Sequence, residues 1–409
     1  MAMLVCVGRG TGLSGLRRDR SPAAGPTHAR GAGAGHEPVS LQCGLPYRHG
    51  PRAPTRLMSP AFSIYLDLLR LGAALLVFVH HASYASYHGR WLQGLAGHGH
   101  EAVVVFFVLS GYVIAYNREH KDHDWRHYAV QRLSRLWSVA LPALALTLLL
   151  DAWGRTLLPA LYADVTGGWE RVLASAFFVN EFWVEGWAAG SNIPLWSLSY
   201  EAGYYLLFGV LGFAPARWRW PLALACALLV GPRLLLLLPA WWLGVFIYRS
   251  PRVRLMSVSQ GVLLAAVGLA WALLMSLGKV GNLYITWRLL ALLPQPLGAL
   301  LGHSEAFVSD NLIALGVAAH VAGLSAWLRG RGAPAGLARW AARLSRATFP
   351  IYLFHYPLLQ FFAALTTVWP LLAWGGVTVL SLALSAAFTS PCDRLRQLMR
   401  RGLTRLLKA

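Results

Sequence analysis

The sequence predicts an all-α fold, a polytopic membrane helix bundle of about ten transmembrane helices with both termini in the cytoplasm. Two observations predict it. First, 56% of the 409 residues are hydrophobic and only 13% are charged, which is not the composition of a soluble domain. Second, the apolar residues form segments close to the length that crosses a bilayer, and Lys and Arg gather in the short loops between them.

The charge of the chain is strongly basic, with 36 Lys and Arg against 16 Asp and Glu and a formal net charge of +20. An excess of this size can indicate nucleic-acid binding, but here the basic residues follow the loops of a membrane protein. We therefore expect a lipid bilayer and no nucleic acid as a partner. The 4 Cys are far apart and fit no metal or redox spacing, so we expect no metal site.

The apolar segments divide the chain into three parts. Residues 1–61 are rich in Gly, Pro, Ala and Arg, and we expect a disordered basic extension, with Met58 as an alternative start of translation. Residues 62–392 form the membrane domain, and residues 393–409 form a basic cytoplasmic tail. The ten apolar segments lie at about 63–83, 102–117, 136–151, 195–213, 220–231, 233–248, 258–277, 310–328, 347–367 and 371–390.

The loops predict the orientation of these segments. Basic residues follow every second segment, starting with the segment at 102–117, which predicts that these loops are cytoplasmic. The loops at 152–194 and 278–309 carry few basic residues and should face outward. The short segments at 220–231 and 233–248 are either two spans or a re-entrant hairpin, and removing both leaves the orientation of the rest unchanged.

The first segment carries ionisable residues inside an otherwise apolar helix, where such residues are expensive and often functional. Arg70 and His81 are eleven residues apart, which on an α-helix means about 20° from the same face and a rise of about 16 Å. His80 lies about 80° off that line and is the weaker candidate. Arg70 should lie towards the cytoplasm and His81 near the outer surface. In the simpler interpretation, Arg70 snorkels to the headgroups beside Asp67, and His81 is a packing residue.

Carboxylates open two later segments. Glu101 follows His98 and His100 at the level expected for His81, and it is a candidate partner that orients an imidazole. His98 is better explained as an interfacial loop residue. Glu201 lies about a turn and a half inside its helix, where an unpaired carboxylate would be costly. We expect Glu201 to be paired, protonated or exposed to a water-filled cavity.

Other candidate residues have a functional and a structural interpretation. His355 stands between Pro350 and Pro357, where it either contacts a substrate or satisfies backbone groups that the prolines leave free. Arg132 and Arg135 lie at the cytoplasmic mouth of the third segment and could bind phosphates. Positive-inside anchoring explains the two arginines equally well.

Small and aromatic residues complete the pattern. Ser110 and Gly111, inside an apolar segment, are better explained by close helix packing than by chemistry. Trp196 has the position of an interfacial belt residue and is a candidate substrate contact. Tryptophans in the outer loop at 152–194 hint at stacking on a sugar; they are Trp169, Trp183 and Trp187.

These blocks, in this order, resemble the acyltransferase-3 family of integral membrane acyltransferases, which includes bacterial O-antigen and exopolysaccharide O-acetylases. The resemblance covers residues 62–392. Its most specific sign is a basic residue and a His with ten residues between them, which falls on Arg70 and His81. The remaining blocks are Phe106-FVLSGY-Val113, Arg132 with Arg135, Trp196-SL-Ser199 with Glu201, and Ile351-YLFHY-Pro357.

The resemblance implies transfer of an acyl group, usually acetyl, from cytoplasmic acyl-coenzyme A to a hydroxyl of an envelope carbohydrate or lipid-linked glycan. It implies a bacterial inner membrane, and acyl-coenzyme A as a co-substrate, with no permanently bound cofactor. Arg70 would bind or polarise the donor, and His81 would be a general base or a transient acyl carrier, oriented by Glu101 or Glu201. Glu101 departs from the family pattern, in which a small residue is common.

A proton-coupled transporter is the competing interpretation. Arg70, His81, Glu201 and His355 would then form a relay through the membrane. Inverted repeats would favour this interpretation, and the sequence shows no convincing internal repeat. A dependence on coenzyme A would distinguish the enzyme from the transporter.

Overall fold

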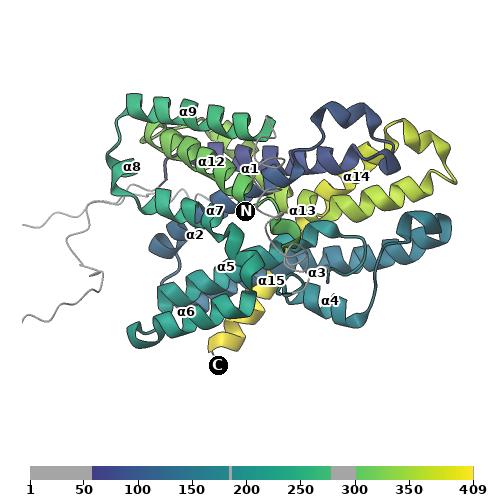
Figure 1. Ribbon diagram of the computed structural model, residues 1–409, viewed down its shortest axis with the longest axis horizontal. Helices are drawn as coiled ribbons and strands as arrows, with labels where there is room; N and C mark the ends of the chain where they lie inside the picture. The colour runs from purple at the N-terminus through teal and green to yellow at the C-terminus, as the bar shows by residue number, and fades with distance from the viewer. Residues whose placement is uncertain (1–57, 184–186, 278–300, 409) are drawn as a thin grey trace, which may run out of the picture. The chain divides into compact units, whose positions relative to one another are not determined.

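A computed structural model describes residues 58–183, 187–277 and 301–408 of the chain (Figure 1). All regular elements in these ranges are helices, so the predicted all-α class is confirmed. The expected disorder of the N-terminal extension concerns residues that lie almost entirely outside the described part. The first helix begins at Pro60, directly after Ser59, whose Oγ accepts a hydrogen bond from the backbone N–H of Phe62 at 3.2 Å. This is a standard helix N-cap with proline in the first turn.

A helix lies at each of the predicted apolar segments. These helices are α1 (Pro60–Ala82), α2 (Gly99–His120), α3 (Trp125–Leu157), α5 (Trp196–Phe213), α6 (Ala216–Val230), α7 (Pro232–Arg249), α9 (Val258–Leu277), α12 (Phe307–Trp327), α13 (Ala335–Leu365) and α14 (Gly376–Ala387). Three others are α4 (Trp169–Ala176), α8 (Pro251–Leu255) and α15 (Thr389–Lys408).

The length and composition of the described helices suit a membrane. Within the described ranges, 5 helices (α1, α2, α3, α9 and α12) are long and apolar enough to cross a bilayer, and the bent pair α6 and α7 makes a sixth if it is one span. The protein is therefore an integral membrane protein. The predicted total of ten spans and the cytoplasmic placement of both termini stay predictions.

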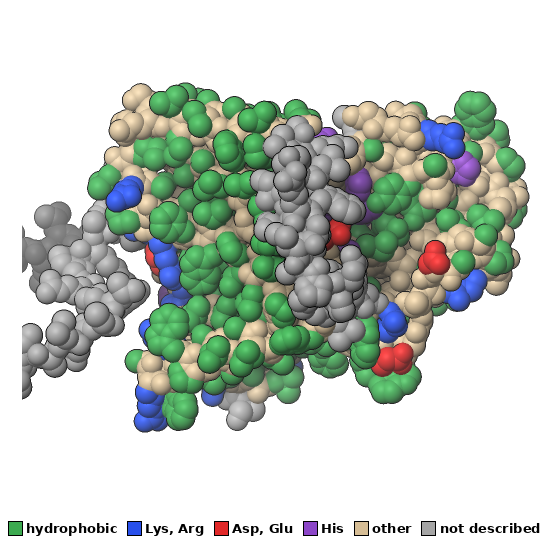
Figure 2. All heavy atoms as spheres, viewed as in Figure 1, with side chains coloured by type: hydrophobic (Ala, Val, Ile, Leu, Met, Phe, Trp, Pro, Cys, Tyr) green, Lys and Arg blue, Asp and Glu red, His purple; other side chains and the backbone are tan. Residues whose placement is uncertain are grey.

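The packing of α1 positions its ionisable residues. Helix α1 lies between α2 and α13, α3 packs on α13 and α15, and α2 packs on α7. Helix α9 packs on α12 and leaves most of its own surface uncovered (Figure 1). Its exposed side chains include Leu263, Val267 and Leu274, as expected for a surface that faces lipid. In Figure 2, hydrophobic side chains cover much of the visible face, and several Lys and Arg gather at the left edge, near α8.

The pair α6 and α7 turns by 118° at Gly231. Arg233, just after this turn, forms an ion pair with Glu181 at 3.2 Å, and both side chains are almost fully buried. The backbone carbonyl of Arg233 also accepts a hydrogen bond from Ser304 Oγ at 2.8 Å. Glu181 and Ser304 belong to the two loops predicted to face outward, so the turn lies on the side of those loops. This placement agrees with either interpretation of the pair.

Helices α2 and α7 approach each other through glycines. A Cβ atom added to Gly111 would overlap the backbone carbonyl oxygen of Trp241, and one added to Gly244 would overlap that of Val108. The expectation that Gly111 permits close helix packing is therefore confirmed. Ser110 has a different role, because its hydroxyl contacts a carboxylate in the cavity described below.

We predict that Gly111→Ala destabilises the protein by about 1–3 kcal/mol, because the backbone of α7 cannot retreat without loss of packing. Thermal unfolding of the detergent-solubilised protein measures this change. Gly336→Ala is the matched control, since a Cβ at that helical position in α13 meets open space and should leave stability unchanged or slightly higher. Equal unfolding midpoints for the two variants would contradict the packing.

Candidate functional site

A cavity that opens to solvent lies among α1, α2, α3, α5 and α13 and encompasses about 640 Å³, part of which is open solvent. Its lining combines aromatic and aliphatic side chains with a few polar groups, the usual composition of small-molecule sites. The lining residues are Arg70, Val103, Phe106, Phe107, Ser110, Arg135, Ser197, Leu198, Glu201, Thr348, Phe349 and Tyr352.

Arg70 lines this cavity from the middle of α1. The residue is only 8% exposed, and its Nη1 lies 4.0 Å from Asp67 Oδ1. Asp67 is held in turn by a hydrogen bond from Ser345 Oγ of α13 at 2.8 Å. The simpler interpretation of the sequence is right about the Asp67 partner but wrong about the position, because Arg70 is buried at a cavity and does not snorkel to a surface. Its Nη2 is buried and has no hydrogen-bond partner among the residues that the structure describes.

Glu201 is paired, as expected for a carboxylate inside an apolar bundle. It accepts hydrogen bonds from Ser110 Oγ at 2.9 Å and from the Tyr205 hydroxyl, and it lies 3.8 Å from Arg135 Nη2. The partners come from α2, α5 and α3, so this one carboxylate joins three helices. Tyr205 was not singled out from the sequence, although its spacing of four residues from Glu201 is the spacing of facing side chains on a helix.

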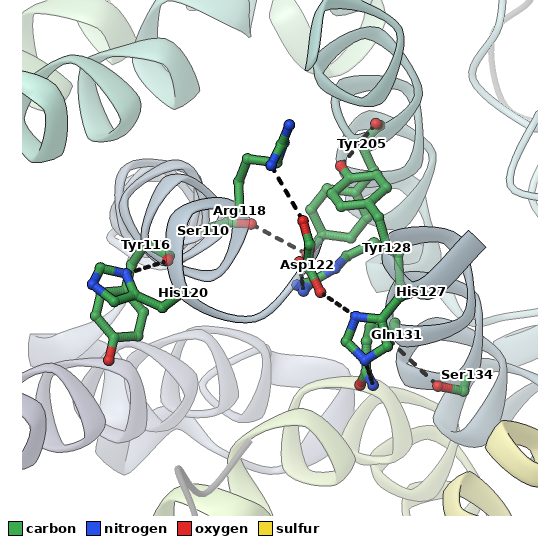
Figure 3. Close-up of polar contacts among 11 residues, drawn as sticks. Ser110, Tyr116, Arg118, His120, Asp122, His127, Tyr128, Gln131, Ser134 and Tyr205 are labelled. Carbon is green, nitrogen blue, oxygen red and sulfur yellow. Dashed lines mark hydrogen bonds and ion pairs between the residues drawn. The ribbon is translucent and has the colours of Figure 1, made fainter. Parts of the chain in front are cut away.

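Arg132 and Arg135 separate in the structure, although both were placed at the mouth of one segment. Helix α3 begins at Trp125, so both arginines lie inside the helix and not at its end. Arg132 is bound by Asp122 at 2.9 Å, and Asp122 also contacts His127 at 3.0 Å (Figure 3). Arg135 faces the cavity. Both arginines therefore have a carboxylate partner, but only Arg135 lines a cavity described here.

A smaller cavity shares Arg70 and Arg135 with the larger one. It also opens to solvent and encompasses about 370 Å³, part of which is open solvent. The two arginines therefore stand where the cavities adjoin. The other lining residues come from the first half of α1, the segment just before it and the second half of α2; they are Met58, Ser63, Leu66, Asp67, Val113 and Asn117.

The C-terminal segment, expected as a basic cytoplasmic tail, forms helix α15, which packs on α3. Arg346 of α13 contacts Asp393 of α15 at 3.4 Å. Burial, together with repulsion from neighbouring arginines, Arg135 first, lowers the pKa of Arg396 to about 10. Helix α15 thus adds positive charge to the region around Arg135.

The partner of His81 is His355. His81 Nδ1 and His355 Nε2 lie 2.9 Å apart, and the rings stack with centroids at 5.1 Å. His355 is fully buried, whereas His81 is partly exposed. Tyr84 and Tyr356 contact the His81 ring edge-on. Among the described residues, His81 hydrogen-bonds neither Glu101 nor Glu201, so the expectation that a glutamate orients this imidazole is wrong.

The hydrogen-bond network assigns the tautomers of this pair. His355 Nδ1 lies 2.9 Å from the Ile351 carbonyl oxygen, which can only accept, so Nδ1 carries the proton. Neutral His355 then presents the lone pair of Nε2, and His81 donates to it from Nδ1. His81 Nε2 is left unprotonated, which is the form of a general base.

His80 has two partners of its own. The backbone N–H of Gly97 donates to His80 Nδ1 at 3.0 Å, and the Tyr84 hydroxyl lies 3.1 Å from Nε2. Both ring nitrogens are therefore engaged in local structure. This supports the choice of His81 over His80 as the candidate for chemistry.

Glu101 and Trp196 lie among other histidines. Glu101 is 3.9 Å from His98. Trp196 is buried, and its indole stacks on His100 and on His303. Its expected role as a belt residue at the membrane surface is wrong, because its ring packs inside the bundle. Burial lowers the pKa of His303, in the loop before α12, to about 3, so this imidazole is neutral in the stack.

The described ranges contain no group of three or more His, Cys, Asp or Glu side chains that could hold a metal ion. Comparison with known families gives one match. The family model described as an acyltransferase domain, Acyl_transf_3, matches residues 63–390, which include both cavity arginines and the two paired histidines. No curated protein and no solved structure matched the chain.

We predict that Glu201→Ala lowers the free energy of unfolding by about 3 kcal/mol, because it leaves Arg135 in the bundle without its carboxylate. The thermal unfolding midpoint in detergent measures the loss. The double variant Glu201→Leu with Arg135→Met should regain most of it, since no uncompensated charge remains. A single variant as stable as the wild type would show that this pair does not hold α3 and α5 together.

Proposed function

The chain belongs to the acyltransferase-3 family of integral membrane acyltransferases, and from this premise we propose that it moves an acetyl group from cytoplasmic acetyl-coenzyme A to a hydroxyl of an envelope carbohydrate or lipid-linked glycan. The proposed location is a bacterial inner membrane. The observation that carries the proposal is the hydrogen bond between His81 and His355, because it leaves a basic nitrogen on a partly exposed imidazole.

In the proposed reaction, His81 Nε2 removes the proton of the acceptor hydroxyl as its oxygen attacks the thioester carbonyl carbon. The carbon–sulfur bond then breaks, and the proton passes from His81 to the departing thiolate of coenzyme A. The positive charge that forms on His81 is shared through Nδ1–H with His355 Nε2. His355 is therefore a positioning residue that keeps His81 in the required tautomer and orientation.

The proposed role of Arg70 is to bind the donor. The rise of α1 between Arg70 and His81 is about 16 Å, and the Arg70 guanidinium lies beside Asp67, one turn further from His81. Arg70 and His81 are therefore too far apart to act together on the thioester carbon. Their separation suits an extended donor that reaches from one residue to the other. Arg135 and the basic residues of α15 would attract the phosphates of the nucleotide.

A covalent acyl-histidine on His81 Nε2 would use the same lone pair, in two steps instead of one. Transfer of the acyl group to His81 would release coenzyme A before the acceptor binds. Exchange of labelled coenzyme A into acetyl-coenzyme A without acceptor would distinguish this route from direct transfer.

A carbohydrate acceptor is supported by exposed aromatic side chains on the side predicted to face outward. Trp169 is 76% exposed and Trp187 is 39% exposed. Trp183 is also exposed, but its indole N–H donates to the Leu228 carbonyl at 2.7 Å, which ties it to the end of α6. Trp169 and Trp187 are therefore the better candidates for stacking on a sugar. The family match favours the enzyme over the transporter.

We predict that cells carrying the wild-type protein add alkali-labile acetate to their envelope glycans and that His81→Ala and Arg70→Ala abolish this addition. Removing a general base typically costs about 10²–10⁴-fold in rate. Acetate released by alkali is measured at matched membrane levels of each protein. His80→Ala is the control and should retain most activity, because Gly97 and Tyr84 engage both ring nitrogens of His80 and its ring only packs beside His81. Equal loss in the two histidine variants would contradict the assignment of His81.

We predict that His355→Ala lowers kcat about 10–100-fold and leaves the KM for acetyl-coenzyme A nearly unchanged, because His355 orients the base without binding the donor. His355→Gln should recover much of this loss, since the side-chain oxygen of glutamine can accept the His81 Nδ1–H bond. Steady-state kinetics of the purified protein measure both values. A raised KM with normal kcat would instead make His355 a substrate contact, the role considered from the sequence.

A further inference from the structure

Asn117, near the end of α2, has an amide without hydrogen bonds. The residue is 1% exposed, and within the described part of the chain neither its Nδ2 nor its Oδ1 has a hydrogen-bond partner. Its backbone carbonyl, by contrast, accepts from the N–H groups of Lys121 and Asp122. Buried polar groups nearly always have partners, and one that lacks them calls for an explanation.

The surroundings of Asn117 indicate a ligand that is narrow and only partly polar. Asn117 lines the smaller cavity, whose walls include the apolar side chains of Leu66 and Val113. Arg70 lines the same cavity, and its Nη2 is also buried without a hydrogen-bond partner. A ligand there would meet apolar walls, the Asn117 carboxamide with its N–H donors and its carbonyl acceptor, and an additional N–H donor from Arg70 Nη2.

A secondary amide is the group that matches a free carboxamide. Its N–H can donate to Asn117 Oδ1, and its carbonyl oxygen can accept from Asn117 Nδ2. The pantetheine arm of coenzyme A is a thin chain in which secondary amides alternate with short methylene segments. On the predicted orientation, the end of α2 lies on the cytoplasmic side, and the arm would pass Asn117 before it reaches the larger cavity.

We propose that the smaller cavity admits the pantetheine arm of the donor and that Asn117 binds one of its amides. This inference rests on the proposed function, in which acyl-coenzyme A is the donor. It adds a donor-binding residue outside the blocks that carry the family resemblance. It also explains why the two cavities adjoin at Arg70 and Arg135, because the arm would pass between these side chains.

The test compares acetyl-coenzyme A with two analogues, each with one pantetheine amide replaced by an ester, which lacks the N–H donor. The wild type should use at least one analogue about tenfold less well in kcat/KM, as expected for one lost hydrogen bond in a buried site. Asn117→Ala should raise the KM for acetyl-coenzyme A about tenfold and should use the same analogue as well as acetyl-coenzyme A.

Two further variants separate recognition from folding. Asn117→Leu fills the site with an apolar side chain of similar size and should also lose the discrimination. Asn180→Ala is the matched control. Asn180 is also 1% exposed, and its Nδ2 has no hydrogen-bond partner among the described residues, but it lines neither cavity. Its replacement should leave the discrimination between the donors intact.

The outcomes distinguish this inference from the proposed function. If the wild type uses acetyl-coenzyme A and Asn117→Ala discriminates among the donors as the wild type does, the proposed role of Asn117 is wrong, but the proposed enzyme activity stands. Water alone would then occupy the smaller cavity. A wild type that uses no acetyl-coenzyme A would overturn both.

Discussion

Two arginines inside an apolar bundle impose the constraint that organises this site. Arg70 and Arg135 each need a counter-charge, and Asp67 and Glu201 supply one at 4.0 Å and 3.8 Å. These distances are longer than hydrogen bonds, so each charge is balanced while N–H donors stay available for a ligand. Because the partners of the two carboxylates come from α2, α3, α5 and α13, the pairs also fix how these helices meet around the cavities.

One helix separates the two tasks of the proposed reaction. Helix α1 holds Arg70 at the cavities and His81 about 16 Å further along. The neighbouring helices complete each end, since α3 brings Arg135 to the arginine end and α13 brings His355 to the histidine end. A donor with a long arm can touch both ends at once. An enzyme that joins a cytoplasmic donor to an acceptor on the other side needs such an arrangement.

Local patterns in the sequence predict the helices and the pairing of Glu201, because each follows from helix geometry or from the cost of charge in an apolar segment. They place Arg70 and His81 close to one face of α1, but only Arg70 lines the two cavities described here. They cannot predict that His81 meets His355, which is 274 residues away and arrives only when α1 packs on α13. The different environments of Arg132 and Arg135 depend on Asp122, which lies beyond the end of α2. Trp196 resembles an interfacial residue in the sequence, and only the packing of the bundle buries it. Nothing in the local sequence distinguishes Asn117, whose burial also depends on that packing.

The division of labour along α1 is tested most directly by equilibrium binding of labelled acetyl-coenzyme A to the purified His81→Ala and Arg70→Ala variants. If Arg70 holds the donor and His81 acts on the acceptor, His81→Ala binds acetyl-coenzyme A as tightly as the wild type without turning it over, and Arg70→Ala loses binding. If His81→Ala loses binding as fully as it loses turnover, or if Arg70→Ala binds normally, the two residues do not act in this way.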